Sequence, residues 1–171
     1  MIETYQGQWV RLGQVTSNQA AVTSYDHAYG ATWATAFQNP DLWPDSLAIE
    51  LPQECNGLRG MFAVSDANNE TLAVTVWMKD KNGPPKPLVI FSAVTAGTAV
   101  VSKDPHTGAT LTDFAYADTL TLGTLYIGDV DVYNVTDGVS EWRCDAMGGS
   151  WLFLTGDAGT AEDCIGWIKV Y

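Results

Sequence analysis

Residues 57–79 read GLRGMFAVSDANNETLAVTVWMK, and apolar side chains recur at every second position on both sides of a polar centre. The alternating apolar residues are Leu58, Phe62 and Val64 in the first half, and Leu72, Val74, Val76 and Met78 in the second half. This period of two is typical of β-strands that bury one face. The centre, residues 65–70, is rich in Asn and Asp, which tolerate turn conformations. The stretch therefore predicts a β-hairpin over 57–79.

Similar strand patterns continue in both directions from this stretch. They predict strands at 47–51, 88–94 with a continuation at 100–101, 121–135 with a bend at Gly128, 139–145, 150–155 and 165–171. Turn-forming clusters at 79–87 and 104–108 separate them, and only residues 28–38 would allow a short helix. Strands at this spacing indicate a single all-β domain over 1–171, a mostly antiparallel, jelly-roll-like β-sandwich.

One segment, near 24–46, is long, irregular and rich in aromatic residues. The aromatic side chains there are Tyr25, Tyr29, Trp33, Phe37 and Trp43. A loop of this length in a compact domain either covers the core or carries function. We therefore expect these five residues either to plug one end of the sandwich as a covering loop or to contact a partner as an arm, and they are the candidate partner-binding residues.

The charge of the chain restricts its partners. The formal net charge is −12, and residues 104–171 hold eleven Asp and Glu residues against Arg143 and Lys169 alone. Nucleic acid is bound by releasing counterions from Lys and Arg, and the chain has no basic stripe beyond Lys79, Lys81 and Lys86. Neither a secretory signal at Met1 nor an apolar run of about 18 residues is present, so we expect no membrane partner and synthesis in a cytoplasm.

No recognisable catalytic motif occurs in the sequence. The two histidines, His27 and His106, lie in predicted loops outside any nucleophile, metal or phosphate-binding pattern. We therefore expect a protein that is not an enzyme and needs no cofactor or metal. Two alternatives stay open on the acidic residues, a structural calcium site and a small hydrolase with a carboxylate pair. Their candidate residues are Asp129, Asp131, Asp157, Glu162 and Asp163.

Cysteine and tryptophan add two further expectations. Three cysteines, Cys55, Cys144 and Cys164, suit reduced, buried thiols, although spacing leaves a Cys144–Cys164 bridge open. Seven tryptophans and seven tyrosines are many for 171 residues. We expect the tryptophans within predicted strands to be buried, and Trp33 and Trp43 to contact something outside the fold. The predicted buried set is Trp77, Trp142, Trp151 and Trp167.

The last third of the chain resembles a known class of proteins. Residues 137–145 (DGVSEWRCD), 151–154 (WLFL) and 166–171 (GWIKVY) are similar to the closing strands of small virion proteins of tailed bacteriophages. The resemblance covers about residues 120–171 and implies a β-sandwich that decorates or cements a capsid. It also implies location in the virion and binding to major capsid protein or another virion protein at symmetry axes, as a homo-oligomer that is often a trimer.

Two hypotheses of different classes follow. The first is a non-catalytic virion structural protein, a capsid decoration or cement protein that stabilises the phage head. The alternative is a carbohydrate-binding module or lectin-like domain that uses exposed aromatics, assisted or not by calcium.

Overall fold

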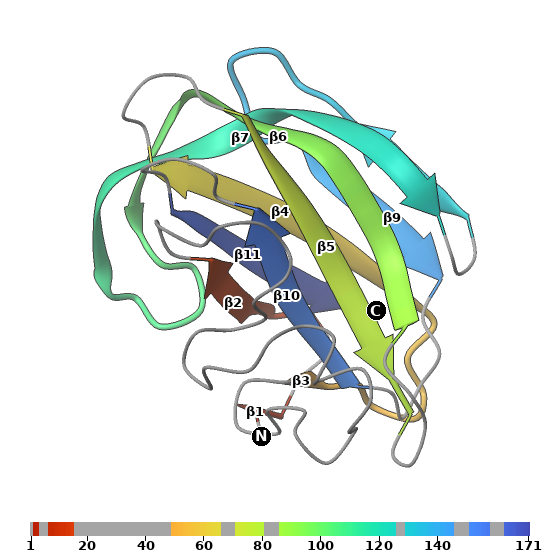
Figure 1. Cartoon of the computed structure of the whole chain (residues 1–171). Helices are drawn as coiled ribbons and strands as arrows, with labels where there is room; N and C mark the ends of the chain where they lie inside the picture. Colours follow the sequence, from red (N-terminus) through yellow and green to blue (C-terminus); the bar gives the residue numbers. More distant parts are fainter. Residues whose placement is uncertain are drawn as a thin grey trace.

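The computed structural model describes residues 2–3, 7–15, 49–65, 71–80, 86–125, 129–145, 151–157 and 163–171, and every regular element within them is a β-strand (Figure 1). The strands are β1 (Ile2–Glu3), β2 (Trp9–Val15), β3 (Ile49–Glu50), β4 (Gly57–Ser65), β5 (Thr71–Lys79), β6 (Lys86–Lys103), β7 (Thr110–Leu125), β8 (Val130–Tyr133), β9 (Glu141–Asp145), β10 (Trp151–Asp157) and β11 (Cys164–Val170). These residues contain no helix long and apolar enough to cross a membrane.

The strands form one curled sheet. Its order is β1-β3-β10-β5-β6-β7-β4-β11-β2, with β9 beside β4 and β8 beside β9. All pairs are antiparallel except β1 with β3, so the prediction of an all-β, mostly antiparallel fold is confirmed. Hydrogen bonds do not divide the strands into two sheets, because the long strands β6 and β7 curve and join both sides of the core. In Figure 1, β5, β6 and β10 lie in front of β4 and β11.

The main core lies inside this curl. It contains the alternating residues that the sequence marks as buried, Leu58, Phe62, Val64, Leu72, Val74, Val76 and Met78. Around them pack side chains from most other strands, including Trp142, Phe91 and Ile168. Phe62 and Phe91 meet edge to face with centroids 5.2 Å apart, and Phe62 stacks on Trp142 at 6.4 Å. The prediction that these seven alternating side chains point into the core is therefore confirmed.

The pairing predicted for 57–79 is wrong. Both strands exist, as β4 and β5, but they do not pair with each other. β4 pairs with β7, β9 and β11, whereas β5 pairs with β6 and β10. β4 is buried on both faces over most of its length and lies in the interior of the sheet, with partners on both edges. A turn signal in the sequence sets a reversal of direction but not the partner strand.

Segment 121–135 is also not one bent strand. β7 ends at Leu125 and pairs with β6, and β8 begins at Val130 and pairs with β9, while residues 126–128 lie outside the described ranges. Two strands that the sequence hardly signals complete the sheet. They are β2 and the first part of β7, residues 110–119. β7 continues without a break into the start of the strand predicted at 121–135.

β7 leaves β4 after residue 116, and β9 takes its place beside the first half of β4. The backbone of β7 that loses this partner is satisfied by two side chains. Asn134 accepts from the Leu120 N–H at 2.9 Å through Oδ1 and donates to the Leu120 carbonyl at 3.1 Å through Nδ2. The fully buried Ser140 donates from its hydroxyl to the Asp118 carbonyl at 2.6 Å and from its backbone N–H to the Ala117 carbonyl at 2.9 Å. These bonds fix the position of β8 and β9, since buried backbone groups must be paired.

Candidate functional site

The five predicted partner-binding residues, Tyr25, Tyr29, Trp33, Phe37 and Trp43, lie outside the described residues, as does the short helix considered at 28–38. The arm and the covering loop therefore both stay predictions. The strand tryptophans are placed clearly. Trp77, Trp142 and Trp167 are buried as predicted, and the side chain of Trp151 lies outside the described set. The site that the described residues do form is elsewhere, on the outer face of β8, β9, β4, β11 and β2.

Cross-strand register aligns charged and aromatic residues on this outer face. One row runs across all five strands, because Asp131 is opposite Arg143, Arg143 opposite Arg59, Arg59 opposite Lys169 and Lys169 opposite Trp9. The inward-facing neighbours Trp142 and Cys144 are buried, so the odd-numbered residues of β9 point outward. We call the exposed surface formed by Asp129, Asp131, Tyr133, Glu141, Arg143, Asp145, Arg59, Lys169, Tyr171 and Trp9 the charged face.

Its side chains hold one another in place. Arg59 binds Glu141 at 2.9 Å through Nε and at 2.7 Å through one terminal nitrogen, a two-pronged contact that fixes the guanidinium plane. The Arg59 guanidinium lies 5.8 Å and the Lys169 ammonium 5.2 Å from the centre of the Trp9 ring. Arg143 lies 5.0 Å from the centre of the Tyr133 ring. At these distances each cation is attracted to the face of its aromatic ring. These contacts order the side chains of the charged face.

Tyr171 lies beside the first residue of β4, at one end of the charged face. The Tyr171 N–H donates to the Gly57 carbonyl at 3.1 Å, and the Tyr171 carbonyl accepts from Asn56 and Gly57. The Tyr171 ring lies so close to Gly57 that an added Cβ would come within 2.6 Å of its Cζ atom. Glycine at 57 is therefore required for this approach, and it leaves the tyrosine fixed yet 48% exposed.

Beyond the charged face, the turn between β6 and β7 covers the outer side of the second half of β4 and the first half of β11. A second apolar cluster lies there on the outer side of β4 and β11, formed by Met61, Ala63, Val101, Ile165 and Trp167. Asp104, only 1% exposed, anchors the turn over this cluster. Its carboxylate accepts from the Trp167 indole at 3.1 Å and from the Arg11 guanidinium at 3.2 Å, and from two backbone N–H groups of its own turn.

These partners decide the protonation of Asp104. Burial by itself would raise the pKa of this carboxyl, but the N–H groups of His106 and Thr107, the Trp167 indole and the charge of Arg11 together lower the pKa below its ordinary value. Burial and the negative Asp104 raise the pKa of the nearby Tyr116. His106, one of the two candidate histidines, accepts from the Arg11 backbone N–H at 3.1 Å through Nδ1, while His27 lies outside the described residues. Asp104 is thus a charged structural anchor.

The acidic candidates do not come together among the described residues. Asp129 and Asp131 are exposed on the charged face, and Asp163 accepts from the Gln14 amide at 3.1 Å. Glu162 and the side chain of Asp157 lie outside the described set. Within that set no group of three metal-binding side chains occurs.

All three cysteines are free and buried. The Cys144–Cys164 bridge is excluded, because these residues pair with Leu58 and Val64 of β4, six residues or about 20 Å apart along the strand, far beyond disulfide reach. Burial, with smaller effects of Asp145 and Cys55, raises the pKa of Cys144 to about 12. Burial and Asp163 raise that of Cys164, and burial raises that of Cys55 despite its bond to the Gly57 carbonyl.

We therefore expect a thiol reagent such as dithionitrobenzoate to leave the folded protein unlabelled at mildly alkaline pH. The thiolate is the reactive form, and both burial and a raised pKa suppress it. In denaturant, all three thiols should react at once. A single thiol that reacts rapidly in the native protein would contradict this placement.

Trp9, Arg59, Arg143 and Tyr133 are not among the binding residues predicted from the sequence. A local signal existed for part of the face, since Glu141, Arg143 and Asp145 alternate with the buried Trp142 and Cys144. Nothing local indicated that Arg59, Lys169 and Trp9 would join them, because their alignment arises from strand pairing. Comparison of the chain with protein-family models, with curated proteins and with solved structures finds no match.

Proposed function

We propose that this chain is a non-catalytic structural protein of a virion, a decoration or cement protein that binds and stabilises a phage head. The observation that carries the proposal is the charged face, which combines arginines with exposed aromatic rings on a rigid sheet. Arginine, tryptophan and tyrosine are the residues that most often dominate the energy of protein interfaces. The resemblance of residues 120–171 to capsid decoration proteins suggests the capsid as the binding partner. β8, β9 and β11, which belong to that segment, contribute most of the charged face.

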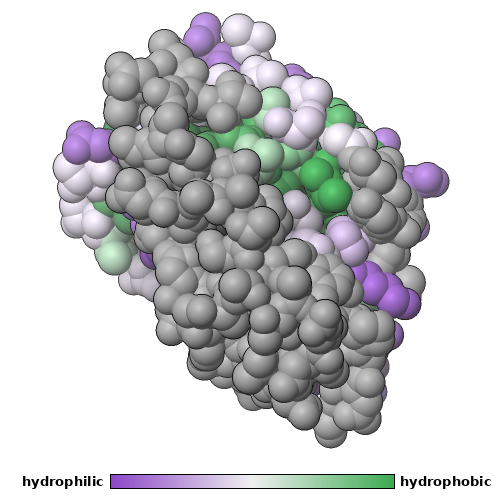
Figure 2. Space-filling view, in the orientation of Figure 1, coloured by the Kyte–Doolittle hydropathy of each residue, from purple (hydrophilic) through white to green (hydrophobic). Residues whose placement is uncertain are grey.

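The anchors of such a contact are expected at Arg143 and Tyr133. Tyr133 is 49% exposed and is contacted by the Arg143 guanidinium, so the two side chains present one ordered unit. Ordering in advance lowers the entropy cost of binding. In the orientation of Figure 2, the described surface over β5 and β6 shows apolar atoms near the upper centre and hydrophilic ones at the margins. The charged face belongs to other strands, of which β4 and β11 lie behind β5 and β6 in Figure 1.

Co-sedimentation tests the proposal. Purified protein mixed with undecorated phage heads should pellet with them and saturate at a fixed stoichiometry. Arg143→Ala and Tyr133→Ala should each weaken binding by about tenfold or more, as for interface anchors worth about 1.4–2 kcal/mol. Lys86→Ala is the matched control, since Lys86 is an exposed cation at the start of β6, away from the face.

Wild-type protein that stays in the supernatant with heads and with tails would overturn the proposal. Saturable binding to a glycan array, lost in Trp33→Ala or Trp43→Ala, would instead establish the carbohydrate-binding alternative.

A further inference from the structure

The charged face has a gradient of charge across its strands. Asp131 of β8 and Asp129 just before it bring two acids, and β9 brings a net charge of −1 from Glu141, Asp145 and Arg143. β4 and β11 each bring one cation, Arg59 and Lys169. The face therefore sums to −1, from four acids and three cations, so the rest of the chain carries −11 of the total −12. Arg11 on β2 is left out, because Asp104 neutralises it.

The two ends of this gradient act as separate charges. Three strand spacings of about 4.8 Å place β8 about 14 Å from β11. That separation exceeds the screening length of about 8 Å at physiological salt, so a partner meets an acidic end and a basic end independently. The face carries only −1 of the chain's formal charge of −12, so its own charges oppose the approach of a second copy only weakly.

A two-fold axis can bring such a face against itself in two ways. An axis across the strands sets β8 over β8 and β11 over β11, which opposes like charges. An axis parallel to the strands sets β8 of one copy over β11 of the other, so each acidic end meets a basic end twice. Isologous interfaces require this kind of self-complementarity.

We propose that the part of the charged face on β8, β9, β4 and β11 is a dimer interface, on which a second copy of this chain docks about a two-fold axis that runs parallel to the strands between β9 and β4. The inference rests on the proposed role of the face in assembly, and a second copy docked there would compete with a phage head for Arg143 and Tyr133. Asp131 of each copy lies opposite Lys169 of the other, since both residues belong to the same cross-strand row. Near the axis Arg143 approaches Arg59 of the second copy. The charge of that Arg59 is already neutralised by Glu141 of its own copy, because a terminal nitrogen of Arg59 lies 2.7 Å from Oε2 of Glu141.

The size of the face sets the strength of the contact. Four strands by five residues cover roughly 19 Å by 17 Å, or about 300 Å² per copy. Stable interfaces bury about 800 Å² per partner, so the dimer is a weak one that forms only at high protein concentration. Measurements must therefore extend from micromolar to millimolar protein.

Sedimentation velocity on the purified chain tests the inference. The wild type should shift from monomer to dimer as concentration rises, and high salt should reverse the shift. Asp131→Lys and Lys169→Asp should each weaken dimerisation at least about tenfold, because each variant replaces both attractive contacts by repulsive ones. Lys86→Asp makes a similar reversal outside the face and should dimerise like the wild type.

Two rescues separate a lost contact from a damaged fold. An equimolar mixture of Asp131→Lys and Lys169→Asp should form a heterodimer, because positions 131 and 169 are both lysine in the first variant and both aspartate in the second. The double variant carrying both substitutions should recover the homodimer. Failure of both rescues, a trimer, a strictly monomeric wild type, or single variants that dimerise normally would each overturn the inference.

Capsid binding is scored separately. Wild-type protein that pellets with heads but never dimerises would leave the proposed function standing and remove the dimer. A dimer that binds no head or tail component would do the reverse.

Discussion

Replacing Trp142 with alanine is expected to lower the free energy of unfolding by about 3–5 kcal/mol, the usual cost of truncating a buried tryptophan. Trp142 is completely buried, and its ring packs against Phe62 and, with centroids 5.8 Å apart, against Phe91. These three rings join β4, β6 and β9, so the cavity would open where the two sides of the curled sheet meet. Urea denaturation followed by far-ultraviolet circular dichroism measures the loss.

Two further variants identify the cause. The Trp142 indole N–H is buried without a hydrogen-bond partner, so Trp142→Phe gives up no bond and should cost clearly less than alanine. A Cβ added at Gly60 would lie 2.0 Å from the indole Cε2 atom, so Gly60→Ala should be strongly destabilising in the wild type. In the Trp142→Ala background the same glycine substitution should cost little, since the obstructing ring is gone.

Val100→Ala serves as the control for this series. Val100 is an apolar strand residue that is 75% exposed, and its truncation should change stability by no more than about 0.5 kcal/mol. If Gly60→Ala were equally costly with and without the tryptophan, the close approach between the two residues would be refuted.

Asp104→Ala is expected to lower the free energy of unfolding by about 3 kcal/mol. The substitution leaves the buried Trp167 indole N–H without an acceptor and Arg11 without its carboxylate partner. Arg11 keeps 28% of its side chain exposed, which limits its share of the loss. The turn between β6 and β7 should also detach, since Asp104 accepts from the backbone N–H groups of His106 and Thr107. Thermal unfolding, with increased proteolysis within 104–109, measures both effects.

The pH dependence of this variant carries a definite sign. Because folding lowers the pKa of Asp104, its ionised form stabilises the native state at any pH above the ordinary aspartate value of about 3.9. That contribution is lost as pH falls from this value through the lower folded pKa. The difference in unfolding free energy between wild type and Asp104→Asn should therefore be constant near neutral pH and shrink below about pH 4.

Asp129→Ala is the matched control for this carboxylate. Asp129 is exposed, and its removal should change stability by no more than about 0.5 kcal/mol. A stability difference between wild type and Asp104→Asn that stayed the same down to strongly acid pH would show that Asp104 is not held ionised by its neighbours.

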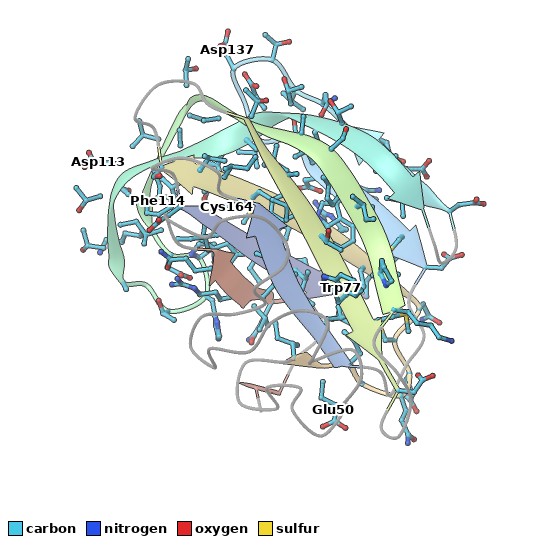
Figure 3. The ribbon with its side chains drawn as sticks, in the orientation of Figure 1. Glu50, Trp77, Asp113, Phe114, Asp137 and Cys164 are labelled. Carbon is cyan, nitrogen blue, oxygen red and sulfur yellow. The ribbon has the colours of Figure 1, made fainter. Side chains whose placement is uncertain are left out.

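Two aspartates at the periphery of the molecule have a left-handed backbone conformation. Asp113 and Asp137, which Figure 3 shows at the periphery, both have the left-handed backbone that Asp tolerates, with φ of 63° and 55°. Asp137 lies in a turn before β9. Asp113 lies within β7, at a register shift against β6, and no sequence signal distinguished it from other polar strand residues. Figure 3 places Cys164 within the ribbon instead, in keeping with its apolar strand context.

The sequence by itself determined the class of the fold and the direction of most side chains. Alternation is a local property of the backbone, so Leu58, Phe62, Leu72 and Val74 could be assigned to the core without knowledge of their neighbours. Only the tertiary structure decided which strands pair, and with this the charged face. Arg59, Arg143 and Lys169 are far apart in the chain, and they become neighbours because β4 pairs with β9 and β11 across its two edges. Such pairing depends on the packing of both faces of β4 at once, which no local pattern records.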